Sequence, residues 1–217
     1  MPNLFPRNSN SFLWWTIGLG GVFVVLLITG LTVFARTHNN QVGVPVEQPV
    51  AFSHSLHAGS MGLDCRYCHT TVETSNFANV PATETCMTCH SQVRVNSPQL
   101  AVVQESWDTG TPIAWNRVHD MPDFVFFDHS IHVAKGVGCS DCHGPVHQME
   151  GMWKNEPMTM GWCLECHKSP EDYLRPRSEV FNMDYTRPRN QVELGAQLVQ
   201  DYHIDTEKLP QCWTCHR

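Results

Sequence analysis

The longest hydrophobic stretch of the chain lies near its N-terminus. Residues 12–35, FLWWTIGLGGVFVVLLITGLTVFA, contain no charged side chain. A helix of about 20 apolar residues is long enough to cross the hydrocarbon core of a bilayer. Trp14 and Trp15 stand near one end of this run, and Arg36 follows its other end, an arrangement typical of membrane interfaces. The pattern predicts a transmembrane anchor over residues 1–36, with a short polar lead that contains Arg7.

A cleaved signal peptide is the competing interpretation of the same stretch. Val33, Phe34 and Ala35 resemble the small-residue site at which such peptides are cut. The apolar part of a signal peptide is usually only about 7–15 residues long, however, and this run is much longer. We therefore expect an uncleaved anchor.

After the anchor the pattern becomes polar, irregular and rich in turns. Pro45 and Pro49 disfavour a helix, so residues 37–51 are expected to form an extended linker. Residues 52–217 are then expected to form one mainly α and irregular domain, with short helices. Two of these helices are expected over 97–104 and 190–202. Directly before the second of them, the stretch LRPRSEVFNMDYTRPRN is typical of a strap that lies on a partner or on the domain itself.

All ten cysteines fall into five C-x-x-C-H motifs, and none is left over. In such a motif two thiols are covalently attached to a haem and the following histidine binds the iron. A disulfide framework or a set of zinc sites would not require a histidine after every pair. The sequence therefore predicts five covalently bound haem c groups, whose faces supply much of the interior of a domain poor in core residues. The attachment cysteines are Cys65 and Cys68, Cys86 and Cys89, Cys139 and Cys142, Cys163 and Cys166, and Cys212 and Cys215.

A second element, Phe-x-His-x-x-His, occurs twice, each time shortly before a haem motif. The copies are FSHSLH at 52–57 and FDHSIH at 127–132, and each is followed by two motifs. This indicates a duplicated two-haem module over 52–96 and 127–170, with a fifth haem at 203–217. Two histidines three residues apart share one helical face, so one can serve the nearby haem and the other a neighbouring haem.

The histidines can be divided between the two sides of each iron. The proximal ligands are the histidines that end the motifs: His69, His90, His143, His167 and His216. The duplicated element supplies four distal ligands: His54, His57, His129 and His132. For the fifth distal position His119 and Met160 are the leading candidates, with Met158 behind them and His147 not favoured. A His/Met iron would have the highest potential and would be the natural exit for electrons.

Charge and cofactor chemistry indicate where the domain works. The formal net charge of −7 and the absence of a basic patch argue against a nucleic-acid partner. Haem c is attached outside the cytoplasm in bacteria. We therefore expect a single-pass protein of the bacterial cytoplasmic membrane, with its N-terminus inside and the haem domain on the periplasmic side.

Several linked motifs together resemble a known family. They are the anchor, FSHSLH and FDHSIH, RVHDMPDFVFFDHSIH, EPMTMGWCLECHKSP and the terminal CWTCHR. Nearly the whole chain is similar to the pentahaem cytochrome c subunit of alternative complex III, and the modules resemble class III cytochromes of the c3 and c7 types. The resemblance implies an electron-conducting subunit of a membrane quinol:acceptor oxidoreductase. Its partners would be iron–sulfur, polytopic quinol-binding and monohaem cytochrome subunits, together with a periplasmic acceptor.

Three functions fit the motifs to different degrees. An electron-transfer subunit within a respiratory or photosynthetic complex needs six-coordinate irons and no catalytic residue of its own, which the ligand count favours. A reductase of a small anion such as nitrite would need an open iron, commonly signalled by a variant proximal ligand, and all five motifs end in histidine. A stand-alone quinol dehydrogenase is the remaining alternative, although one helix makes a thin quinol pocket.

Overall fold

The computed structural model of the chain describes residue 6 and residues 8–216, without the side chains of residues 36–40. The expected lead residue Arg7 lies outside the described residues. The chain divides into two compact units, Met1–Gln41 and Val42–Arg217.

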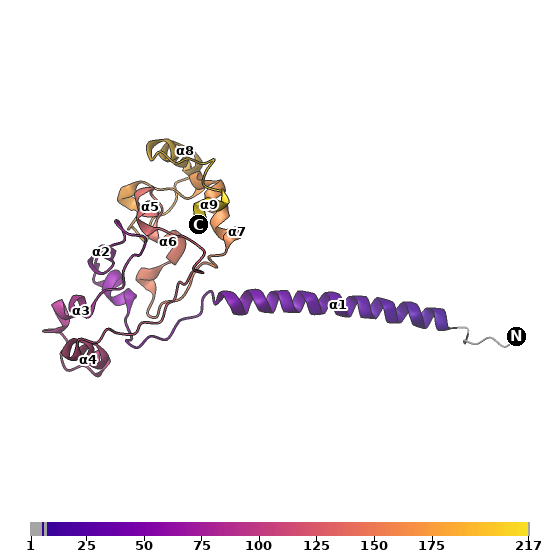
Figure 1. Ribbon diagram of the computed structural model, residues 1–217, viewed down its shortest axis with the longest axis horizontal. Coiled ribbons are helices and arrows are strands. Elements are labelled where there is room, and N and C mark those ends of the chain that lie inside the picture. Colours follow the sequence, from indigo (N-terminus) through magenta and orange to yellow (C-terminus); the bar gives the residue numbers. More distant parts are fainter. Residues whose placement is uncertain (1–5, 7, 217) are drawn as a thin grey trace. The chain divides into compact units, whose positions relative to one another are not determined.

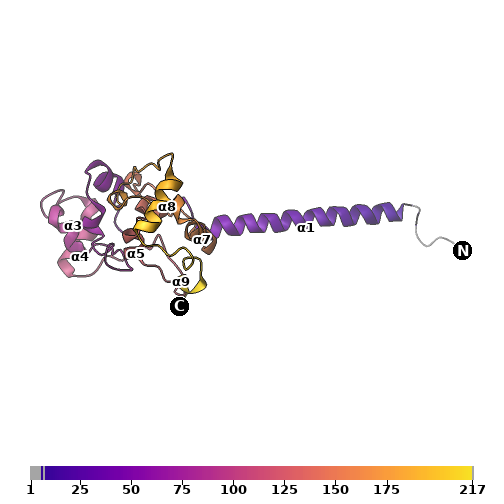
Figure 2. The same ribbon diagram turned by 90° about the horizontal axis from the view of Figure 1, so that it is seen from above.

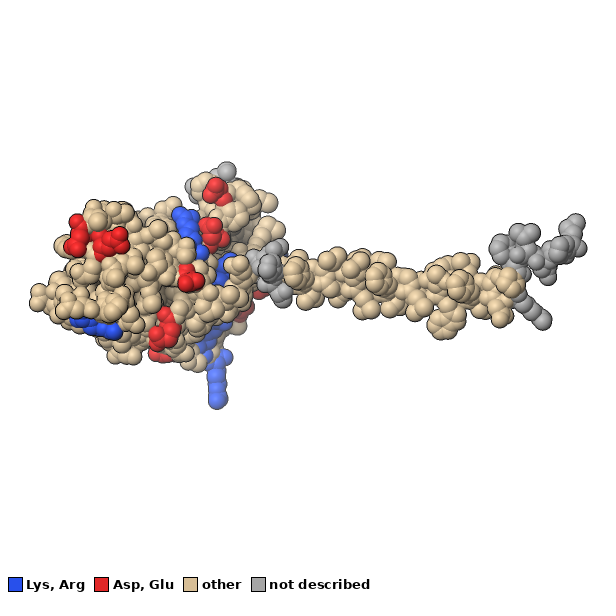
Figure 3. Space-filling view, turned by 90° about the horizontal axis from the view of Figure 1, so that it is seen from below, with Lys and Arg blue, Asp and Glu red and all other residues tan. Residues whose placement is uncertain are grey.

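In the described part of the first unit there is one long helix, α1 (Ser9–Asn40). Its segment Ser9–Ala35 is 27 residues long and strongly apolar, which is enough to cross a membrane. No part of its most apolar window is buried against the rest of the protein. In Figure 3 the described part of this helix shows no acidic or basic side chain. The helix continues to Asn40, so the expectation of an extended chain from residue 37 was wrong for the first four residues. Nothing in Thr37–Asn40 opposes a helix, because the first proline comes only at position 45.

The remainder of the linker is outside any helix and touches a distant part of the second unit. Isolated bridges join Val42 to Lys154 and Pro45 to Trp153, and the Gly43 N–H donates to the Lys154 carbonyl at 2.8 Å. Within the described residues these bridges are not extended into a named strand. The domain is therefore helical and irregular, as the sequence predicts.

The second unit consists of short helices joined by long irregular segments (Figure 1). Most are one to three turns long, which suits motifs of five residues. The α-helices are α2 (Cys65–Cys68), α3 (Thr83–His90), α4 (Ala101–Thr109), α5 (His129–Ala134), α6 (Cys139–His143), α7 (Met160–Lys168), α8 (Gln191–Asp201) and α9 (Cys212–Cys215). The other short helices are η1 (Ser55–Ser60, a π-helix), η2 (Pro98–Leu100), η3 (Val146–Gln148), η4 (Pro170–Asp172) and η5 (Arg177–Glu179).

The two helices expected from capping signals are present with shifted boundaries. The first begins with the 3-10 turn η2 and continues as α4 to Thr109, beyond the expected end. The second is α8, but Asn190 makes no side-chain cap. Tertiary contacts hold both helices. Thr83 Oγ1 on α3 lies 2.6 Å from Ser106 Oγ on α4, and the Gln191 amide donates to the Leu174 carbonyl at 2.8 Å.

The apolar core made by the protein itself is small. Among the described residues only seven hydrophobic side chains are buried: Val50, Val72, Val103, Met149, Leu174, Val180 and Leu198. Many large hydrophobic side chains of the second unit stay exposed, including Phe124, Phe126 and Trp213. Burial of apolar surface is the main stabilising contribution in folding, so a domain of this length with so few buried side chains requires another apolar component.

The helices that carry cysteine motifs follow one another across the second unit. Figures 1 and 2 both show α3 and α4 together at one end, α7 and α9 toward the opposite end, and α5 between them. The Pro/Arg-rich stretch expected to form a strap runs over the domain itself. The Val180 carbonyl accepts from the Cys139 N–H at 3.1 Å, and Arg66 lies over the Phe181 ring at 4.5 Å.

Candidate haem-binding sites

Each C-x-x-C-H motif lies on a short helix. In one helical turn the residues at positions i and i+3 project from the same side, which places both thiols together. At the first motif the turn is initiated by Asp64, whose carboxylate accepts from the Arg66 N–H at 2.8 Å. All ten cysteines are free thiols, so each is available for attachment to a haem.

Seven of the predicted ligand histidines have the same hydrogen-bond arrangement. In each, ring Nδ1 lies within 2.6–3.1 Å of a backbone carbonyl. A carbonyl can only accept, so Nδ1 carries the proton and Nε2 keeps its lone pair for a metal. The seven are His57, His69, His90, His129, His132, His167 and His216.

Three pairs of these rings are spaced as two imidazoles on one iron. With a metal–nitrogen bond of about 2 Å and a ring centre about 1 Å beyond each nitrogen, the two centres lie about 6 Å apart. The observed separations are 6.3 Å for His57 and His90, 6.3 Å for His129 and His143, and 6.2 Å for His132 and His167. Each pair joins one histidine of the repeated element to one motif histidine.

The two copies of the repeated element make the same aromatic contacts. Phe52 stacks on His57 and meets His54 edge-on, and Phe127 makes the same two contacts with His132 and His129. In both copies the second histidine points to the second motif of its module. By this correspondence we expect His54 to pair with His69, although His54 Nδ1 lacks the hydrogen bond that His129 Nδ1 makes. Burial lowers the pKa of His54 to about 4, and the neighbouring His69 adds to this effect.

The candidates for the fifth distal ligand differ sharply in environment. His119 Nε2 is buried and has no hydrogen-bond partner, and its ring centre lies 4.4 Å from that of His143. Burial lowers the pKa of His119 to about 4, which keeps the ring neutral and able to bind a metal. Met160 is 67 % exposed, Met158 is partly buried, and the buried methionine is Met149.

His147 is used differently. Its Nε2 lies 3.0 Å from an oxygen of Asp184, and its Nδ1 is buried without a partner. The ring lines a cavity of about 290 Å³ that also includes Cys65 and Phe181. This cavity lies where a haem attached through Cys65 would need space.

Burial at the third motif is especially strong. It raises the pKa of Cys142 to about 12 and of Cys139 to about 11, and it lowers the pKa of His143 to about 3. A neutral, partly buried imidazole next to two partly buried thiols has the donor set that attachment and ligation of a haem require.

Contacts between motifs define their spatial order. The first and second meet through Tyr67 Oη and Thr88 Oγ1 at 2.8 Å. The second element approaches the first motif through His129 Nδ1 and the Asn76 carbonyl at 2.8 Å. The second copy of the repeated element joins the third and fourth motifs. Its His129 faces His143 of the third motif, and its His132 faces His167 of the fourth motif. The fourth meets the fifth where His167 Nδ1 donates to the Leu209 carbonyl at 3.1 Å. The order in space is second, first, third, fourth, fifth.

These observations fit covalently bound haem. Paired imidazoles at the spacing of an iron site, the buried Nε2 of His119 without a partner, cysteines outside any disulfide and a protein core too small for its domain are all consistent with it. The residues that would hold it are the motif cysteines and the paired histidines.

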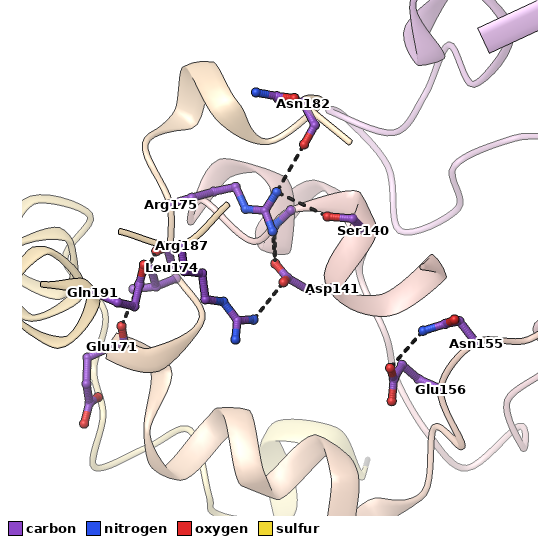
Figure 4. A network of polar contacts seen from close by, with 11 residues as sticks. Ser140, Asp141, Asn155, Glu156, Glu171, Leu174, Arg175, Asn182, Arg187 and Gln191 are labelled. Carbon is purple, nitrogen blue, oxygen red and sulfur yellow. Dashed lines mark hydrogen bonds and ion pairs between the residues drawn. The ribbon is translucent and has the colours of Figure 1, made fainter. Parts of the chain in front are cut away.

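Sequence reasoning missed a charged cluster around the third motif (Figure 4). Asp141 lies inside the motif and binds Arg175 and Arg187, each at less than 3 Å. The only signal in the sequence was the arginine content of the strap, which did not indicate where the arginines would point.

Comparisons with known proteins define the class. A family model described as "Class III cytochrome C family" matches residues 32–110, and one described as "Cytochrome c7 and related cytochrome c" matches residues 125–217. Together with the histidine pairs, these matches identify a multihaem c-type cytochrome.

Individual relatives define the family more closely. The "Menaquinone reductase, multiheme cytochrome c subunit" of Nitratidesulfovibrio vulgaris is 36% identical over 172 residues, which cover 70% of this chain and 80% of that protein. The chain belongs to the family of multihaem cytochromes c that includes this subunit. Cytochrome c-552 of Bacteroides fragilis is 32% identical over 96 residues, and that of Porphyromonas gingivalis is 32% identical over 79 residues. The matches cover only 18% and 16% of those two proteins.

Proposed function

We propose that this chain is a membrane-anchored pentahaem cytochrome that carries electrons between a quinone-linked membrane complex and a carrier on the periplasmic side. The observation that carries the proposal is the set of three histidine pairs at 6.2–6.3 Å, arranged along a continuous row of motifs. Haem supplies one-electron chemistry at its iron. The protein supplies the order of the sites, their ligands and their surroundings.

The ligand set supports an electron carrier over a reductase of a small anion. His54, His57, His129 and His132 serve the first, second, third and fourth haems opposite their motif histidines. His119, whose buried Nε2 lacks a partner, is the remaining candidate for the fifth distal ligand, although its ring lies beside His143 of the third motif. With all five irons six-coordinate, no position is left for a substrate.

The full-length protein is expected to contain five covalent haems, all low-spin. Intact mass and a pyridine haemochrome assay give the count, and absorption and EPR spectra give the spin state. Four or fewer haems would refute the count, and a high-spin iron that binds nitrite would favour the reductase.

His119→Ala is expected to convert one low-spin iron to high-spin, because the buried Nε2 would be lost as a ligand. Met160→Leu is the matched control and is expected to leave the spectrum unchanged, since Met160 is 67 % exposed. A band near 695 nm in the wild type that disappears in Met160→Leu would instead indicate a His/Met iron.

Two directions of electron flow are consistent with a quinone-linked complex. The sequence motifs resemble the cytochrome subunit of alternative complex III, which implies oxidation of quinol. The relative from Nitratidesulfovibrio vulgaris is named for menaquinone reduction, which favours the opposite direction as the second candidate.

Experiments on the purified complex can separate these directions. If the complex oxidises quinol, added menaquinol is expected to reduce the haems within the turnover time, and electrons then pass to an oxidised periplasmic carrier. If it reduces menaquinone, a reduced periplasmic cytochrome is expected to reduce the haems and menaquinone to reoxidise them. Failure of both tests in a fully loaded complex would contradict a quinone-linked role.

A further inference from the structure

The charged cluster at the third motif consists of two arginines and one carboxylate. Arg175 Nη2 donates to Asp141 Oδ2 at 2.7 Å, and Arg187 Nη2 donates to Asp141 Oδ1 at 2.9 Å. The Gly138 N–H donates to Oδ2 at 3.1 Å. Asp141 lies two residues before the motif histidine His143, so the cluster is part of the motif itself (Figure 4).

The cluster is held tightly and carries a net charge. Arg175 is 2% exposed, and its guanidinium lies 4.6 Å from the centre of the Tyr185 ring. Its Nη1 donates to Ser140 Oγ and to the Asn182 carbonyl, both at 3.3 Å. A side chain at Gly138 would collide with this guanidinium, because an added Cβ would lie 2.0 Å from Arg175 Cζ. Two cations and one anion leave a single positive charge.

The first motif provides a contrast. There Arg66 pairs with Asp64 at 2.7 Å, but the two side chains are 48% and 47% exposed. Water and salt screen such a pair, and its charges cancel. At the third motif Arg175 and Asp141 are only 2% and 12% exposed, so water and salt screen them less. The uncancelled charge comes from Arg187, which binds the same carboxylate and is 43% exposed.

We propose that Arg175, Asp141 and Arg187 raise the reduction potential of the haem held by the third motif. The inference rests on the proposed function, since it requires a haem at Cys139 and Cys142. Reduction of a ferric haem held here, by one electron from a donor, would remove one positive charge from the site. A net positive charge held beside the motif would therefore favour the reduced form. The third motif is the middle of the row, so the cluster would make the centre of the row the place where electrons collect.

The test uses the haem-loaded full-length protein and a spectroelectrochemical titration followed by EPR. The third haem can be assigned because its imidazoles, His129 and His143, are the most nearly parallel of the three observed pairs, at 6°. Those of the fourth and second sites are inclined at 26° and 63°. Parallel and strongly inclined imidazole planes give different low-spin signals.

Four variants separate charge from structure. Asp141→Asn removes the anion and is expected to raise the potential of the third haem. Arg187→Gln removes a partly exposed cation and is expected to lower the potential of the third haem. Arg187→Lys keeps the charge and should leave that potential near the wild-type value. Arg117→Gln, at a position 74% exposed and paired with Asp120, is the control and should shift no haem.

The outcomes are distinguishable. If Asp141→Asn and Arg187→Gln shift the third haem in the same direction, or leave it unchanged, the cluster does not set its potential. If Arg187→Lys behaves like Arg187→Gln, the hydrogen-bond geometry rather than the charge acts on the haem, and the proposal fails. If peptide mass mapping finds no haem on Cys139 and Cys142, the proposed function itself is wrong.

Discussion

Replacing Cys139 and Cys142 by alanine together is expected to abolish accumulation of folded protein. Burial shifts the pKa values of Cys142 and His143 in this motif strongly, and among the described residues only seven hydrophobic side chains form the protein's own core. Loss of the apolar faces of one central haem would remove on the order of 10 kcal/mol of hydrophobic stabilisation, which is of the same size as the net stability of an ordinary domain. The measurement is the yield of haem-stained, protease-resistant protein from the same expression host.

The matched control is the double replacement of Cys212 and Cys215 by alanine. These residues lie at one end of the row, and Cys212 is already exposed. This variant is expected to accumulate as a folded protein with one haem fewer. Equal yields of both variants would show that the third site is not the centre of the interior.

Replacing Arg175 by leucine is expected to lower the free energy of unfolding by about 3–5 kcal/mol, because removal of one partner leaves part of the Asp141 carboxylate buried without a cation. For a chain of this size the melting temperature should fall by about 10 °C. The side chain is 2% exposed, so solvent cannot replace the lost contacts. Circular dichroism of the haem-loaded protein during heating measures the change.

Arg187→Leu serves as the control because Arg187 binds the same carboxylate. Its side chain is 43% exposed, and a half-exposed ion pair contributes less than about 1 kcal/mol. If the two leucine variants are equally destabilised, burial is not what distinguishes the two arginines.

The haem motifs, the membrane helix and the repeated element could all be predicted from the sequence, because each depends on residues close together in the chain. Each C-x-x-C-H motif lies within five residues, so its donor groups come together in any helical turn, and the class of cofactor follows from them. The apolar run at 12–35 is likewise recognisable by itself, because its length and composition are those of a membrane helix. The repeated element could be recognised because both histidines and the phenylalanine recur at the same spacing. All these features depend on neighbours in the chain.

What the tertiary structure decided depends on residues far apart in the chain. Only the tertiary structure shows that His57 faces His90 and that His132 faces His167. It also decides that the second motif lies at one end of the row and the third motif in its middle. The same structure leaves Met160 exposed and buries His119, although spacing made both reasonable ligands. Asp141 meets Arg175 and Arg187 across 34 and 46 residues. The strap's turns decide where those arginines point, and residue type alone carries no information about that direction.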